Sequence, residues 1–129
     1  MNGSFLLDTN IAIAFLENEA AVVHQVGETD RVYLVSVVVG ELSYGAQKSG
    51  RPRENLARIE ALVSRLPVLA CDVAVAWRYG EIKKGLRDKG RPIPENDIWI
   101  AAAAIEHDLT LVTRDGHFAE IAGLSTQAW

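Results

Sequence analysis

Residues 98–115 read Ile-Trp-Ile-Ala-Ala-Ala-Ala-Ile-Glu-His-Asp-Leu-Thr-Leu-Val-Thr-Arg-Asp. The apolar first half predicts a buried helix over residues 98–107, and the β-branched second half predicts a buried strand over residues 109–113. The strand stops at Arg114-Asp115-Gly116, which is typical of a turn. A helix followed directly by a buried strand is the repeating unit of α/β folds.

The same alternation extends to both ends of the chain. Further strands are expected at residues 4–7, 31–35 and 68–70, with an edge strand within 124–129. Helices are expected after Asp8, from an N-cap at Ser36 to about residue 48, from Pro52 to the residue before Pro67, and from a cap at Asp72 to Gly90. A short helix should carry Phe118 and Ile121. Strands that alternate with helices of this length predict an α/β fold with a mostly parallel sheet covered on both faces.

Composition describes one compact domain spanning residues 1–129. The chain is 49% hydrophobic and 23% charged, and no Pro/Gly/Ser-rich linker or repeat divides it. No apolar stretch approaches the roughly 20 residues of a membrane span, and no basic, apolar signal segment opens the chain. Cys71 is the only cysteine, so no internal disulfide can form; we expect a buried thiol and a cytoplasmic location.

Four acidic residues fall at the ends of the expected elements. Asp8 follows the first strand, Asp115 follows the 109–113 strand, Asp97 opens the helix before that strand, and Glu41 lies early in the helix after the second strand. Active-site crevices of open α/β sheets lie beyond the carboxyl ends of the strands. Clustered carboxylates favour a hard divalent cation, which supports phosphodiester hydrolysis. Each aspartate also suits a helix start, and Glu41 suits a solvated surface.

The net charge of -4 bears on the partner class. Taken alone, an acidic balance argues against nucleic acid. However, 17 acidic residues minus the four of the predicted site leave 13, which equals the number of Lys and Arg residues. The charge is therefore compatible with a cation site and a nucleic-acid substrate.

Four motifs in this order resemble the PIN-domain ribonucleases, specifically the VapC toxins of bacterial toxin–antitoxin pairs. They are Leu6-Leu7-Asp8-Thr9-Asn10, Val35-Ser36-Val37-Val38-Val39-Gly40-Glu41-Leu42-Ser43-Tyr44-Gly45, Ile93-Pro94-Glu95-Asn96-Asp97-Ile98-Trp99-Ile100-Ala101-Ala102 and Leu111-Val112-Thr113-Arg114-Asp115-Gly116-His117-Phe118. The resemblance implies a PIN-like three-layer sandwich in which helices flank a sheet of about five strands. It also implies Mg²⁺- or Mn²⁺-dependent hydrolysis of RNA.

The resemblance assigns roles to individual residues. It makes Asp8 and Asp97 the principal metal ligands, with Glu41 and Asp115 acting through waters or orienting the attacking water. The supporting polar positions are Asn10 and Thr113.

It also implies partners for the chain. These are a structured RNA with a single-stranded loop, a VapB-like antitoxin that occludes the site, and a second copy in a homodimer. Four apolar residues of the early helices are candidates for these partner surfaces, but we expect them to lie in the core instead. They are Ile13, Phe15, Leu16 and Tyr44.

Basic residues concentrate in segments 48–65 and 78–91. A solvated helix face is the ordinary reading of such a segment. Arg87 and Arg91 precede the loop before Asp97, and Arg114 adjoins Asp115, so we predict that all three contact RNA phosphates. His117 lies beside Asp115 as well, and a plain surface position is favoured over a functional one for it.

Two other classes remain as alternatives. A non-catalytic PIN-like module that binds RNA or protein predicts at least one missing acid, whereas all four are present. A phosphoacceptor signalling domain predicts a lysine after the last buried strand, where this chain has Thr113-Arg114.

Overall fold

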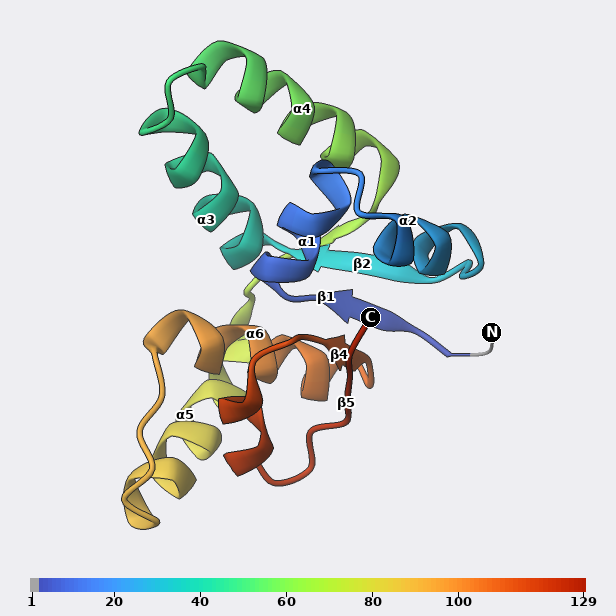
Figure 1. The fold of residues 1–129 in the computed structure, drawn as a ribbon. Helices are drawn as coiled ribbons and strands as arrows, with labels where there is room; N and C mark the ends of the chain where they lie inside the picture. The colour runs from blue at the N-terminus through green and yellow to red at the C-terminus, as the bar shows by residue number, and fades with distance from the viewer. Residues whose placement is uncertain (1–2) are drawn as a thin grey trace.

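The computed structural model describes residues 3–129 and contains a central parallel sheet (Figure 1). In the described residues the sheet has five strands in the order β3-β2-β1-β4-β5, and each neighbouring pair is parallel. The strands are β1 (Phe5–Leu7), β2 (Val32–Val35), β3 (Val68–Leu69), β4 (Thr110–Val112) and β5 (Thr126–Gln127). The predicted α/β class, the parallel sheet and the edge strand near the C-terminus are confirmed.

Helices cover both faces of this sheet. Figure 1 shows α1 to α4 on one side of the strands and α5 and α6 on the other, which gives the three layers that were expected. The helices are α1 (Thr9–Leu16), α2 (Ala20–Gly27), α3 (Ser36–Gln47), α4 (Pro52–Arg65), α5 (Val73–Asp88), α6 (Glu95–Glu106) and the 3₁₀ helix η1 (Gly116–Glu120).

The strand order reverses direction at β1. The chain builds β2 and β3 outward on one side of β1 and then places β4 and β5 on the other. Leu7 at the end of β1 aligns with Val112 at the end of β4, and the Asp8 N–H extends the ladder by donating to the Val112 carbonyl at 2.9 Å. Functional crevices of open α/β sheets form at such a reversal. The fold therefore directs attention to the residues that follow β1 and β4.

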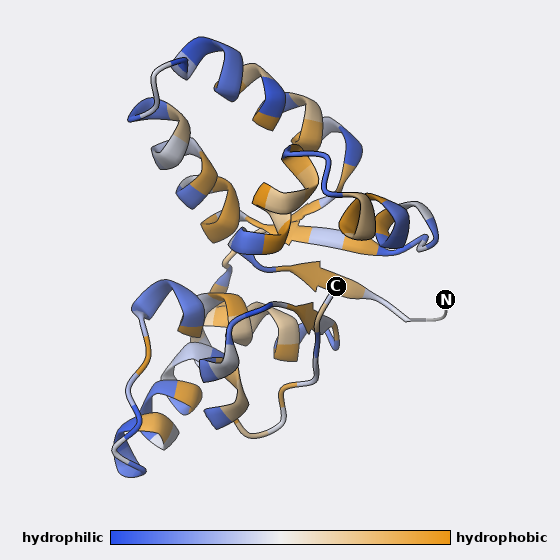
Figure 2. Ribbon diagram, viewed as in Figure 1, coloured by the Kyte–Doolittle hydropathy of each residue, from blue (hydrophilic) through white to orange (hydrophobic). Residues whose placement is uncertain are grey.

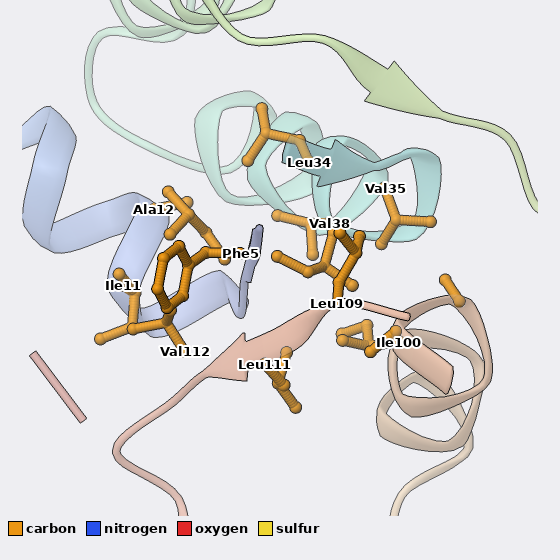
Figure 3. Packing of buried hydrophobic residues seen from close by; sticks show 14 of the residues in the cluster. Phe5, Ile11, Ala12, Leu34, Val35, Val38, Ile100, Leu109, Leu111 and Val112 are labelled. Atoms are coloured by element: carbon orange, nitrogen blue, oxygen red, sulfur yellow. The ribbon is translucent and has the colours of Figure 1, made fainter. Parts of the chain in front are cut away.

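The core holds these two strands rigidly. Leu6, Leu7, Leu111 and Val112 are fully buried, as expected for strands covered on both faces. Figure 3 shows side chains of α1, α3 and α6 packed with those of the strands, and Figure 2 shows hydrophobic residues along β1 and β4 and hydrophilic ones at the outer end of the α3–α4 pair. Well-packed strands fix the positions of the side chains at their ends.

Several predicted helix ends are confirmed. Pro52 begins α4, and the Asp72 carboxylate caps α5 by accepting from the Val75 N–H at 3.1 Å. Gly90 follows α5 with φ +65°, a conformation that glycine adopts without strain. These positions are decided by local chemistry, which the sequence contains in full.

Other helix predictions were wrong. The N-cap of α3 is Val35, because Ser36 is already helical and its hydroxyl accepts from the Cys71 N–H at 3.3 Å. Helix α6 begins at Glu95, three residues before residue 98, since Pro94 occupies its N-cap and acidic residues suit a first turn. Helix α2 was not predicted: it buries only Val22 and Val26, so it has little apolar periodicity.

Some apolar residues expected in the core lie at the surface. The exposed fraction is 42% for Ile13 and 66% for Tyr44. On α5, Val73 is also 70% exposed. Phe15 is buried, as expected. Helices α1, α3 and α5 therefore present apolar side chains that this chain alone does not cover. Within residues 3–129, no helix combines the length and the apolar character needed to cross a membrane.

Candidate functional site

Asp8 lies at the junction between β1 and α1. It is the N-cap of α1, and its side chain is buried, with the residue only 4% exposed. One carboxylate oxygen accepts from the Thr9 N–H at 2.8 Å, and the other accepts from the Thr113 hydroxyl at 2.6 Å. The capping role leaves lone pairs of the Asp8 carboxylate free, because neither bond uses all of them.

Thr113 links the ends of β1 and β4. The residue is 6% exposed, and its hydroxyl oxygen also accepts from the Asp115 N–H at 3.0 Å. A single hydroxyl thus fixes the Asp8 carboxylate and the backbone of Asp115. The supporting position that the sequence predicted is in direct contact with two of the acids.

Glu41 reaches the same region from α3. The Thr9 hydroxyl donates to Glu41 Oε1 at 2.7 Å, which joins α1 to α3 across 32 positions of sequence. The sequence reasoning did not assign a role to Thr9. The only available signal was its place next to Asp8 in the first motif.

Asp97 and Asp115 meet at His117. The His117 Nε2 atom lies 2.6 Å from Asp97 Oδ2, and its Nδ1 atom lies 2.8 Å from Asp115 Oδ1. The side-chain exposed fractions are 17% for Asp97, 28% for His117 and 45% for Asp115. His117 therefore lies inside the acidic site and bridges two of its members, whereas the sequence favoured a plain surface position.

All four carboxylates take part in mutual electrostatic repulsion. Burial raises the pKa of Asp8 above its ordinary value, and the negative charges of Glu41 and Asp115 raise it further, while hydrogen bonds from Thr113 and Thr9 oppose the shift. Burial likewise raises the pKa of Asp97, with added repulsion from Asp8 and Glu41 and opposition from His117. Four carboxylates that repel one another in a partly dehydrated crevice favour an added cation.

The donor atoms fit a divalent cation. Within residues 3–129, Asp97, Asp115 and His117 each offer a donor atom, and these atoms all lie within 4.8 Å of one another. The negative charge of Asp8 also acts on this group, because it raises the pKa of Asp97. Asn10 Oδ1, two residues after Asp8 in the sequence, is buried and accepts no hydrogen bond from the described residues. Carboxylate oxygens are the preferred ligands of hard divalent ions.

The predicted substrate contacts occupy different settings. Arg87 and Arg91 are exposed, and Arg91 lies three residues before Pro94, the N-cap of α6. Arg114 forms an ion pair with Glu19 and donates to the backbone carbonyl of Trp129. The structure therefore leaves Arg87 and Arg91 open to solvent and places Arg114 in a contact with the C-terminal segment.

Comparison with known proteins shows the family of this chain. The model of the PIN domain matches residues 5–124. The chain is also 40% identical to the tRNA(fMet)-specific endonuclease VapC of Shigella flexneri over 97% of both chains. The chain belongs to the VapC family of PIN-domain ribonucleases. VapC-type PIN nucleases depend on metal ions, which agrees with the acidic cluster of this family member.

Solved structures agree with this VapC-family assignment. The fold matches VapBC2 from Rickettsia felis, solved with a promoter DNA fragment, with a TM-score of 0.92 and 28% identity over 97% of this chain and 98% of the other. It matches DNA-bound VapBC from Salmonella typhimurium with a TM-score of 0.91 and 36% identity over 99% of both chains. The PIN-like fold that the motifs implied is confirmed.

Proposed function

We propose that residues 1–129 form one PIN domain that acts as an Mg²⁺- or Mn²⁺-dependent endoribonuclease, the toxin of a toxin–antitoxin pair. The observation that carries the proposal is the convergence of Asp8, Glu41, Asp97 and Asp115 at the reversal point of the sheet. A non-catalytic module would have no reason to keep four mutually repelling carboxylates together. This argues against the alternative of a binding-only PIN-like module.

In this proposal Asp8 and Asp97 are the principal metal ligands. A bound divalent ion would lower the pKa of a water molecule and neutralise charge on the scissile phosphate. Thr113 and the Thr9 N–H hold the Asp8 carboxylate at a fixed angle. Glu41, itself held by the Thr9 hydroxyl, and Asp115 orient waters at the rim of the site.

The proposed substrate is RNA with an accessible single-stranded loop. A relative with 40% identity is named as an endonuclease specific for tRNA(fMet), a structured RNA. In this proposal Arg87 and Arg91 contact phosphates that flank the scissile bond, which is supported by their exposure to solvent. Arg114 would exchange its Glu19 partner for a phosphate oxygen.

The proposed inhibitor is a VapB-like antitoxin. The similar solved structures are VapBC complexes, and this chain has a groove of about 280 Å³ between α1, α3 and α4. Its apolar wall includes Ile13, Leu42 and Ile59, and Glu41 forms part of its lining. An amphipathic antitoxin segment in this groove would bury the exposed Ile13 side chain and block access to Glu41.

A homodimer is also proposed. Val73 and Trp77 lie one turn apart on α5 with exposed fractions of 70% and 73%, so they form one apolar strip. Paired strips would remove this surface from water. Sedimentation of the wild type and of a Trp77→Ser variant tests this: the wild type should be dimeric and the variant more dissociated.

The test of the enzymatic proposal is cleavage of a total RNA pool by the purified protein with Mg²⁺ or Mn²⁺. The wild type should cut internally, and both EDTA and the Asp8→Asn and Asp97→Asn substitutions should abolish cutting. An Asp108→Asn variant is the matched control, because Asp108 is an exposed aspartate on the same chain. Cleavage that persists in EDTA would contradict the proposal.

A further inference from the structure

His117 is the one nitrogen donor in a site otherwise built from oxygens, as far as the structure describes the chain. Its two ring nitrogens lie 2.6 Å and 2.8 Å from the carboxylates of Asp97 and Asp115. The residue belongs to η1, directly after the turn that carries Asp115. The family resemblance gives the four acids a role but gives none to this histidine.

The chemistry of imidazole differs from that of a carboxylate. A metal-bound histidine typically uses one ring nitrogen for the ion and donates from the other to a carboxylate, which fixes the ring. His117 has such a carboxylate on Nδ1, contributed by Asp115, and its Nε2 faces Asp97. Mn²⁺ and Mg²⁺ both accept carboxylate oxygens. Mn²⁺ is the softer of the two and also tolerates an imidazole nitrogen, whereas Mg²⁺ is usually bound through carboxylates and retained waters.

We infer that His117 is a further metal ligand of this site, and that its imidazole makes the site prefer Mn²⁺ over Mg²⁺. The inference rests on the proposed metal site. Nε2 is the atom that binds the metal, because it faces Asp97, a proposed principal ligand. Besides orienting water, Asp115 then also holds the ring in position through Nδ1.

A purely structural role for the ring makes a different prediction. His117 contacts the buried Phe118 ring, with centroids 4.8 Å apart and planes inclined by 36°. If the imidazole only anchored η1, its removal would lower thermal stability and change the binding of both ions alike. A ligand role predicts a change in the ratio of the two affinities.

The experiment measures metal binding by the full chain without RNA. Mn²⁺ binding is followed by electron paramagnetic resonance, and Mg²⁺ binding by its competition with Mn²⁺. His117→Ala should weaken Mn²⁺ binding by at least about tenfold, since losing a residue that merely orients a ligand already costs about ten- to a hundredfold, and it should weaken Mg²⁺ binding much less. His107→Ala is the matched control, because His107 is exposed at the opposite end of α6 from Asp97.

A spectroscopic measurement gives a second readout. Spin-echo modulation of bound Mn²⁺ should show coupling to a nitrogen nucleus in the wild type and in His107→Ala, and should lose it in His117→Gln. Glutamine keeps a polar side chain of similar reach, so it guards against a folding defect in the alanine variant. Equal weakening of both ions, or nitrogen coupling that persists in His117→Gln, would overturn the inference.

The outcomes separate this inference from the proposed function. A wild-type protein that binds Mn²⁺ without nitrogen coupling contradicts only the role of His117. The proposed ribonuclease activity is then decided by the RNA-cleavage experiment. A wild-type protein that binds neither ion contradicts both the metal site and this inference.

Discussion

The β1–α1 junction and the turn after β4 stand side by side, yet they hold their carboxylates differently. Asp8 is almost fully buried as a helix N-cap with a partner on each oxygen. Asp115 lies in an irregular turn with 45% of its side chain exposed, and its Oδ1 atom contacts His117 Nδ1 at 2.8 Å. The first region fixes one ligand rigidly, and the second can adjust. We therefore expect changes at Asp8 to have the larger effects.

The largest difference should appear in the rate of cleavage. Asp8→Asn removes a proposed metal ligand worth several kcal/mol of transition-state stabilisation, or about a thousandfold in rate. Asp115→Asn should cost only about ten- to a hundredfold, as the loss of a residue that orients a metal ligand does. Initial rates on one RNA with saturating Mn²⁺ measure both. Equal losses would remove the distinction between the two regions.

Thr113→Val tests the hydroxyl that joins the two regions. Valine keeps the shape of threonine but removes the hydroxyl that donates to Oδ2 of the buried Asp8 and accepts from the Asp115 N–H. The free energy of unfolding should fall by about 1–3 kcal/mol, as measured by urea denaturation in EDTA. Thr110→Val on the same strand is the control and should have a smaller effect. A change no larger than that of the control would mean that solvent replaces the lost bonds.

The buried carboxylate should also give the stability of the metal-free protein a specific pH dependence. Because burial raises the pKa of Asp8 above 3.8, the folded state favours its protonated form. Its contribution is fully present below pH 3.8 and is lost as the pH rises through the higher folded-state pKa. Urea denaturation in EDTA should show Asp8→Asn gaining stability relative to the wild type across that range.

The reference for this comparison is Asp115→Asn. Because Asp115 is far more exposed, its difference from the wild type should change less with pH. An Asp8→Asn difference that stays constant with pH would contradict the assigned effect of burial. Saturating Mn²⁺, added in place of EDTA at neutral pH, should raise the free energy of unfolding of the wild type, since a ligand that binds only the folded state stabilises it.

The smallest effect should come from the exposed arginines outside both regions. Arg91→Ala should weaken RNA binding a few-fold at low salt, and each lost phosphate contact should reduce the slope of log affinity against log salt by about 0.7. Fluorescence anisotropy in EDTA measures binding without cleavage. Arg53→Ala, an exposed arginine on α4, is the control. An unchanged salt slope would exclude Arg91 from the substrate path.

Local chemistry made part of this protein predictable. The buried strands, the Pro52 helix start, the Asp72 cap and the Gly90 end depend on residues within a few positions of each other. Helix α2 was missed because its short stretch has only two buried residues, and α6 was placed three residues too late because Pro94 serves as its N-cap. Weak apolar periodicity is compatible with a helix or a loop, and a proline near a boundary does not fix the first residue of the helix.

The sequence by itself determined the class of fold and the family, and it predicted the four acidic residues of the site, because apolar periodicity and ordered motifs are properties of the chain. Only the tertiary structure decided that Thr113 bridges Asp8 and Asp115, that Thr9 holds Glu41, and that His117 joins Asp97 to Asp115. These contacts depend on the strand order that places β4 beside β1. Residues more than 100 positions apart meet there, and no local pattern records their distance.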